Sequence, residues 1–116
     1  MRAQFLVLAL CALTPSLLAA LFRLRAGLAP IESRDDLSHA ANYLYMLTGG
    51  EPDAQCARAI EQYLISTIDH GFNASTFTAR VIISTHSDIA SAVAGALGAL
   101  KGPWHGGAPA EVVDQL

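Results

Sequence analysis

Glycine, proline and helix-capping residues divide this 116-residue chain into apolar stretches of helical length. Each divider consists of residue types that commonly end a helix or begin one. The dividers are Gly27 with Pro30, Gly49 with Gly50, Pro52 with Asp53, Asp69 to Gly71, and Ser87 with Asp88. No pair of alternating segments predicts a β-hairpin, and no repeat or low-complexity tract interrupts the pattern. The sequence therefore predicts an all-α fold.

We expect about six helices. The first helical region ends at Gly27, and Thr14 before Pro15 has the pattern of an N-cap followed by a first-turn proline. The second covers residues 37–48, with capping residues supplied by Ser33 to Asp36.

The third helix opens at Pro52 and Asp53. One stripe of it is expected to face a core, and its members are Cys56, Ile60, Tyr63, Leu64 and Thr67. The segment from Ala74 to Ser84 is rich in β-branched residues, but its neighbours favour a helix. Ser87 and Asp88 cap a fifth helix, and Pro109 with Glu111 begins a sixth that the chain end cuts off.

The N-terminal segment is open to three interpretations. A positive residue followed by nine apolar residues, Phe5 to Leu13, is typical of a secretory leader, but Leu18 would occupy a poor position for cleavage after Ala20. A membrane span needs roughly 20 uninterrupted apolar residues, and Thr14 to Ser16 interrupts this run. Composition alone leaves a leader and a buried helix equally open.

Composition and charge exclude some partners. The chain is 53% hydrophobic with a net charge of −3, and Lys101 is its only lysine, which argues against nucleic-acid binding. Cys11 and Cys56 match no metal-ligand spacing. We expect both to be buried thiols of a reducing compartment, with a single disulfide as the alternative.

Four histidines are the candidate functional residues. His39 and His86 are expected to be ordinary structural or exposed residues, and Arg80 to solvate a helix face. His70 and His105 each stand at a helix end beside glycine. In "GPWHGGAP" (102–109), two glycines follow His105 directly, which indicates close approach by backbone or ligand.

Four segments together resemble the citrate synthase family, in particular bacterial and archaeal citrate and 2-methylcitrate synthases. They are "RLRAGLAPI", "HAANYLYMLTGGEP", "DHGFNASTFTARV" (69–81) and "GALKGPWHGGAP" (98–109). The resemblance implies a cytoplasmic, all-helical homodimeric enzyme of the tricarboxylic acid cycle. That enzyme condenses acetyl-CoA with oxaloacetate, without a metal or a resident cofactor, because acetyl-CoA is a substrate.

The resemblance also implies roles for two residues. His105 falls on the catalytic histidine that hydrogen-bonds the thioester carbonyl, and His70 falls on a histidine that binds oxaloacetate. The segment before "RLRAG" belongs, in the family, to a helix at the dimer interface, which favours a retained N-terminus and no membrane. Trp104 stands where the family usually has leucine.

The family's catalytic aspartate, second histidine and arginines would align beyond Leu116. Residues 1–116 are therefore expected to form a partial citrate synthase domain, an internal fragment that lacks N- and C-terminal parts and is inactive alone. One alternative is a fragment of a 2-methylcitrate synthase, which uses propionyl-CoA. The other, from a different class, is a non-catalytic helical association module or a small exported protein.

Overall fold

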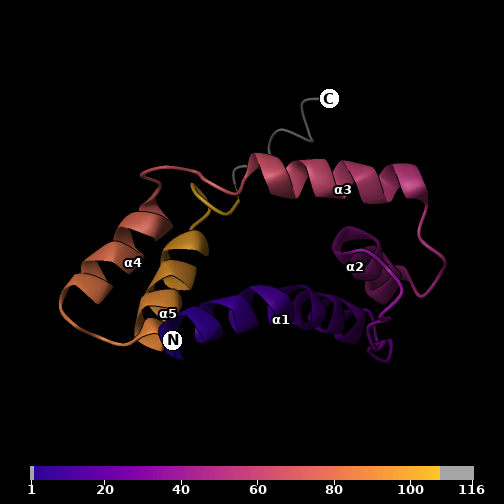
Figure 1. Ribbon diagram of the computed structural model, residues 1–116, viewed down its shortest axis with the longest axis horizontal. Coiled ribbons are helices and arrows are strands. Elements are labelled where there is room, and N and C mark those ends of the chain that lie inside the picture. The colour runs from indigo at the N-terminus through magenta and orange to yellow at the C-terminus, as the bar shows by residue number, and fades with distance from the viewer. Residues whose placement is uncertain (1, 108–116) are drawn as a thin grey trace. The chain divides into compact units, whose positions relative to one another are not determined.

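The computed structural model describes residues 2–107, and the regular structure within that range is entirely helical (Figure 1). The helices are α1 (Arg2–Arg25), α2 (His39–Thr48), α3 (Ala54–Ser66), α4 (Ala74–Ser84) and α5 (Ile89–Leu100). The prediction of an all-α fold is confirmed for this range, including the helix expected from Ala74 to Ser84. The sixth helix expected from Pro109 lies outside the described residues.

The chain divides into two compact units. The first, Met1–Asp69, contains α1, α2 and α3, and the second, His70–Leu116, contains α4 and α5. In the first unit α2 packs against both α1 and α3, and in the second α4 and α5 pack along each other.

Helix α1 runs without a break through Pro15, so the helix start expected at Thr14 is wrong. The Thr14 hydroxyl donates to the Leu10 carbonyl at 2.6 Å, a bond made inside a helix rather than at its first residue. Pro15 removes one backbone donor and crowds the carbonyl four residues before it, but the leucines and alanines on both sides favour helix strongly.

An uninterrupted α1 also removes the argument that Thr14 to Ser16 breaks the apolar run. Within the described residues, Gln4–Arg25 is long and apolar enough to cross a membrane by length and composition. An interface helix and a signal sequence meet the same test, so length and composition do not separate these three roles.

Each of the four helices after α1 begins at a polar cap. Asp53 accepts from the Gln55 and Cys56 amides, and Asp88 accepts from the Ser91 amide, as their sequence positions predict. For α2 the prediction was wrong, because the cap is Ser38, which accepts from the Ala41 amide, and not a residue between Ser33 and Asp36.

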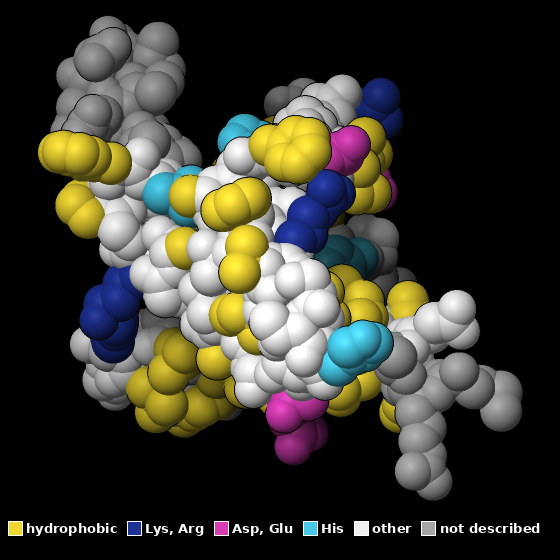
Figure 2. Space-filling view, turned by 90° about the vertical axis from the view of Figure 1, so that its left-hand side faces the viewer, with side chains coloured by type: hydrophobic (Ala, Val, Ile, Leu, Met, Phe, Trp, Pro, Cys, Tyr) yellow, Lys and Arg dark blue, Asp and Glu magenta, His cyan; other side chains and the backbone are white. Residues whose placement is uncertain are grey.

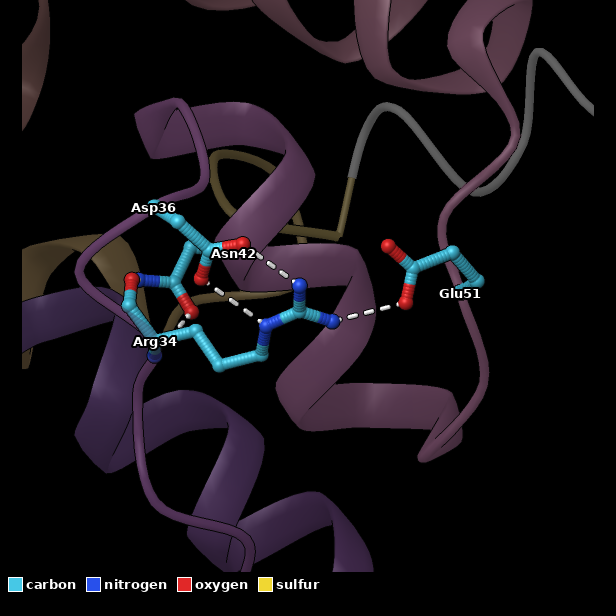
Figure 3. A network of polar contacts seen from close by, with 4 residues as sticks. All are labelled: Arg34, Asp36, Asn42 and Glu51. Atoms are coloured by element: carbon cyan, nitrogen blue, oxygen red, sulfur yellow. Dashed lines mark hydrogen bonds and ion pairs between the residues drawn. The ribbon is translucent and has the colours of Figure 1, made fainter.

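The loop before α2 is instead held by Arg34 (Figure 3). Its guanidinium donates to both carboxylate oxygens of Asp36, at 3.0 and 2.6 Å, and to Glu51 Oε2 at 2.7 Å. Its backbone N–H donates to Asn42 Oδ1 at 3.0 Å, and Asn42 Nδ2 donates back to the Arg34 carbonyl at 2.7 Å. The guanidinium also lies 5.2 Å from the centre of the Tyr45 ring. These contacts tie the loop to α2 and to the segment between α2 and α3.

A second arginine joins α1 to α2. Arg23 Nε donates to the Ala29 carbonyl at 2.6 Å, and Arg23 Nη1 donates to the Leu47 carbonyl at 3.0 Å. Arg23 and Arg34 together give the first unit much of its order through polar contacts.

Few hydrophobic side chains of the described residues are buried. They are Ala19, Ala40, Met46 and Ala92. On α3 the expected core stripe is uncovered, since Tyr63 is 57% and Leu64 is 41% exposed. The surface in Figure 2 accordingly shows many hydrophobic side chains among few charged ones.

The prediction that Cys11 and Cys56 are buried is wrong, because both are exposed free thiols. Cys56 lies on a face of α3 that no other helix covers, since α3 packs mainly against α2. A hydrogen bond to the Asp53 carboxylate raises the pKa of the Cys56 thiol, because the thiolate would face a negative charge.

Gly95 lets α4 and α5 approach closely in the second unit. A Cβ added there would meet Ile82 Cδ1 in a severe overlap and would lie 3.4 Å from Thr78 Cγ2. A Cβ at Gly98, one turn further along the same helix, would meet nothing within 4 Å. A side chain at position 95 would therefore require Ile82 to shift, whereas one at position 98 would not.

We predict that Gly95→Ala and Gly98→Ala have different effects on this helix pair. Gly98→Ala should stabilise it by about 0.5–1 kcal/mol, the usual helix preference for alanine over glycine. Gly95→Ala should lose part or all of that gain, because the end of the Ile82 side chain must shift to make room. Amide hydrogen exchange in α4 and α5 would measure the difference, and equal protection in the two variants would contradict it.

We also predict that the Arg34 contacts make the first unit sensitive to acid. Two hydrogen bonds from Arg34 hold the pKa of Asp36 below its ordinary value of 3.8. A lowered folded-state pKa contributes stability above 3.8 that is lost as the pH falls through the lowered value. Thermal unfolding by circular dichroism across this range should show the loss, weakened by salt, and Asp36→Asn should abolish it.

The matched control is Asp35→Asn, which removes one carboxylate from the same loop and leaves the Arg34 ion pairs in place. An acid dependence that is the same in both variants would contradict the assignment to Asp36.

Candidate functional site

His105 lies in a tight turn that follows α5. The His105 and Gly106 amides both donate to the Gly102 carbonyl at 3.0 Å. A Cβ on Gly106 would overlap the Leu100 carbonyl oxygen, and one on Gly107 would lie 2.6 Å from the Pro103 carbonyl oxygen. The two glycines after His105 are thus required by close approach of the chain's own backbone, one of the two reasons that the sequence suggested.

The imidazole of His105 points back to the beginning of α4. Its Nε2 lies 2.9 Å from Ser75 Oγ, joining residues 30 positions apart, and both side chains are half-buried. Ser75 is in the first turn of α4, so this contact connects the turn after α5 to the start of the neighbouring helix.

Asn73 is the N-cap of α4 and holds Ser75 in turn. Its Oδ1 accepts from the Thr76 amide at 2.9 Å and from the Ser75 hydroxyl at 2.6 Å. A backbone N–H can only donate, so the amide oxygen, and not its NH₂ group, must face the helix. The single proton of the Ser75 hydroxyl is therefore directed to Asn73.

The direction of the Ser75 proton and the tautomer of His105 therefore depend on each other. With its own proton donated to Asn73, Ser75 Oγ can only accept from the imidazole. When the Ser75 proton points to Asn73, a neutral His105 that hydrogen-bonds Ser75 carries its proton on Nε2. The three side chains form one chain of hydrogen bonds running from His105 through Ser75 to Asn73.

The sequence did not identify Ser75 or Asn73 as part of a site. Asn73, Ala74 and Ser75 fit a glycosylation triplet, but such a match is common by chance. A signal existed, because a capping Asn with Ser two residues later stood just after His70, in the segment that carried the family resemblance.

His70 lies in the loop directly before α4, three residues ahead of Asn73, with an exposed side chain. The structure places it in the same unit as His105, and no hydrogen bond joins the two among the described residues. His70 stands near the N-terminus of α4, where a helix favours negative charge.

The remaining candidates have structural surroundings. His39 is the exposed first residue of α2, and His86 follows α4 with a φ of 62°, its amide donating to the Ile83 carbonyl. The Arg80 guanidinium lies 5.1 Å from the centre of the Phe72 ring, with both residues exposed. Among residues 2–107, no three His, Cys, Asp or Glu side chains gather as metal ligands would.

Residues 2–116 match the family described as "Citrate synthase, C-terminal domain". Citrate synthase 2 of Bacillus subtilis is 51% identical over 102 residues, which are 88% of this chain and 27% of that protein. The 2-methylcitrate synthase of Mycobacterium tuberculosis is 49% identical over 105 residues, 90% of this chain and 27% of that protein.

A solved citrate synthase structure is also similar to this chain. The crystal structure of citrate synthase from Pyrobaculum aerophilum superposes with a TM-score of 0.82 at 50% identity, covering 87% of this chain and 25% of that chain. The chain therefore spans about a quarter of the length of the relatives it matches.

We predict that Gly106→Ala disrupts the turn that carries His105. The added Cβ would overlap the backbone of Leu100, which cannot move aside as a side chain can. Breaking the His105–Ser75 contact should follow, and the imidazole NMR signals of His105 should shift towards those of an exposed histidine. Gly102→Ala is the control, because its Cβ would lie 3.3 Å from the Ala99 carbonyl, a contact that a small shift relieves. Equal effects of the two substitutions would contradict this account.

Proposed function

This chain belongs to the citrate synthase family, and we propose that it carries part of the active site of an enzyme that condenses acetyl-CoA with oxaloacetate to give citrate and CoA. The observation that supports this most is the hydrogen bond between His105 and Ser75. It holds an imidazole, half-buried, at the position where the family resemblance places the catalytic histidine.

The chemistry gives His105 a clear task. The methyl group of acetyl-CoA is a very weak acid, so negative charge develops on the thioester oxygen as a proton leaves the methyl carbon. A fixed hydrogen-bond donor at that oxygen lowers the barrier, because the donor does not have to reorient during the reaction. His105 is that donor, and its contact with Ser75 restricts the rotation of the ring.

His70 binds oxaloacetate in this scheme. Its position just before the N-terminus of α4 suits a dicarboxylate, since the helix dipole and an imidazole N–H both attract anions. The base that removes the methyl proton and the arginines that bind the two carboxylates would come from the rest of the enzyme. The isolated 116-residue chain is therefore expected to show no synthase activity.

The same scheme serves a second acyl substrate. A 2-methylcitrate synthase would use propionyl-CoA, and the 49% identity to the Mycobacterium tuberculosis enzyme is close to the 51% identity to the Bacillus subtilis citrate synthase. The proposal therefore includes both acyl-CoA substrates. Measuring the turnover of acetyl-CoA and of propionyl-CoA by a complete enzyme that contains these residues would distinguish them.

The exposed apolar side chains of α1 support an assignment of this helix to a subunit interface. Leu13, Leu17 and Leu21 are each more than half exposed, and the family resemblance favours a second subunit as the apolar partner of this row. We accordingly propose a cytoplasmic homodimer, with neither nucleic acid nor membrane as a partner.

The proposed roles predict separate effects in a restored enzyme, made by grafting residues 5–116 into a complete homologous citrate synthase. His105→Ala should lower kcat by roughly 10²- to 10³-fold, the usual effect of losing one donor to a developing oxyanion. Oxaloacetate affinity should change little in that variant. His70→Ala should instead weaken oxaloacetate binding directly.

Steady-state kinetics and oxaloacetate titration would measure the two effects, with His105→Gln as a second variant. If His105 only packs in the turn, both of its variants would alter thermal stability and leave kcat within a few-fold of the parent graft. That result would refute the catalytic role.

A further inference from the structure

The hydrogen bonds around His105 conflict with the task proposed for it. A neutral imidazole carries one N–H, and when the Ser75 hydroxyl donates to Asn73 that N–H is on Nε2 and faces Ser75. The other nitrogen, Nδ1, is then an acceptor. A neutral His105 in this tautomer has no donor left for a developing oxyanion.

Rotation of the Ser75 hydroxyl removes this conflict, because two acceptors lie within hydrogen-bond distance of it. Asn73 Oδ1 lies 2.6 Å from Ser75 Oγ, and His105 Nε2 lies 2.9 Å from it. If the hydroxyl turns to donate to Nε2, that nitrogen must be unprotonated and the imidazole proton moves to Nδ1. One proton leaves Nε2 for water and one from water binds Nδ1, so the net charge is unchanged.

We propose that Asn73 is a positioning residue for the reaction, whose amide oxygen competes with His105 Nε2 for the Ser75 proton and so sets the tautomer of His105. This inference rests on the proposed donor role of His105. The Asn73 oxygen stays in place in both arrangements, because the Thr76 amide donates to it at 2.9 Å independently of Ser75. The cap of α4 thus fixes one of the two acceptors at a constant position.

The competing explanation is that Asn73 only caps α4. Asp88 provides the comparison, since it caps α5 through the Ser91 amide at the opposite end of α5 from His105. An N-cap without a further role would respond to substitution through helix stability alone.

Two substitutions at position 73 separate these explanations. Asn73→Asp retains a good cap and provides a charged acceptor, which binds the Ser75 proton more strongly. Asn73→Gly also retains most of the capping preference but offers no side-chain acceptor. The two variants thus differ little in helix capping. The strength of the hydrogen bond that accepts the Ser75 proton rises in Asn73→Asp, and this bond is lost in Asn73→Gly.

The measurement is nitrogen NMR of labelled histidine, in the 116-residue chain and in the restored enzyme, with His105→Gln used to assign the His105 signals. We expect Asn73→Asp to shift His105 towards the Nε2–H tautomer and Asn73→Gly to shift it towards Nδ1–H. In the restored enzyme, kcat should be about tenfold higher for Asn73→Gly than for Asn73→Asp, the usual worth of one hydrogen bond. Asp88→Asn should change neither quantity.

Tautomer ratios that do not change, or that move in the same direction in both variants, would overturn the proposal whatever the activity. Ratios that move oppositely while kcat stays equal would confirm the influence of Asn73 on His105 and overturn the donor role instead. If Asn73→Asp does not fold, Ser75→Ala replaces it. Without the Ser75 hydroxyl, adding Asn73→Gly should change nothing further, and an additional shift would overturn the proposal.

Discussion

The close approach of α4 and α5 at Gly95 is the constraint on which the second unit depends. A side chain there would meet the end of the Ile82 side chain, and α4 and α5 pack along each other with this space filled by Ile82. This packing brings the turn after α5 to the start of α4. Ser75 and His105, 30 residues apart in the sequence, can therefore meet at 2.9 Å.

The first unit is ordered in a different way. Arg23 and Arg34 connect backbone carbonyls and carboxylates of the loop, α2 and the segment after it, while few large side chains are buried. Apolar side chains of α1 and α3 are exposed within these 116 residues, which match 27% of the length of Citrate synthase 2 of Bacillus subtilis. The exposed Cys11 and Cys56 follow from the same open surfaces.

In the site, helix capping and proposed catalysis share one residue. Asn73 satisfies a backbone amide of α4 and also accepts the Ser75 proton, so the start of a helix is connected to the protonation of an imidazole. Short hydrogen-bond chains of this kind transmit a preference at one end to the group at the other, because each hydroxyl has only one proton to donate. The functional behaviour of His105 is therefore inseparable from the local fold around it.

The sequence by itself determined the helical class, the caps at Asp53 and Asp88, and the family, because capping chemistry, helical spacing and short motifs are local properties. It also singled out His105, through the glycines that its turn requires. Tertiary structure alone decided that α1 continues through Pro15, that Ser38 caps α2, and that Cys11 and Cys56 are exposed, since these depend on which neighbours a segment finds. It alone placed Ser75 against His105, because a contact across 30 residues is made by the packing of two helices and leaves no periodic signal in the chain.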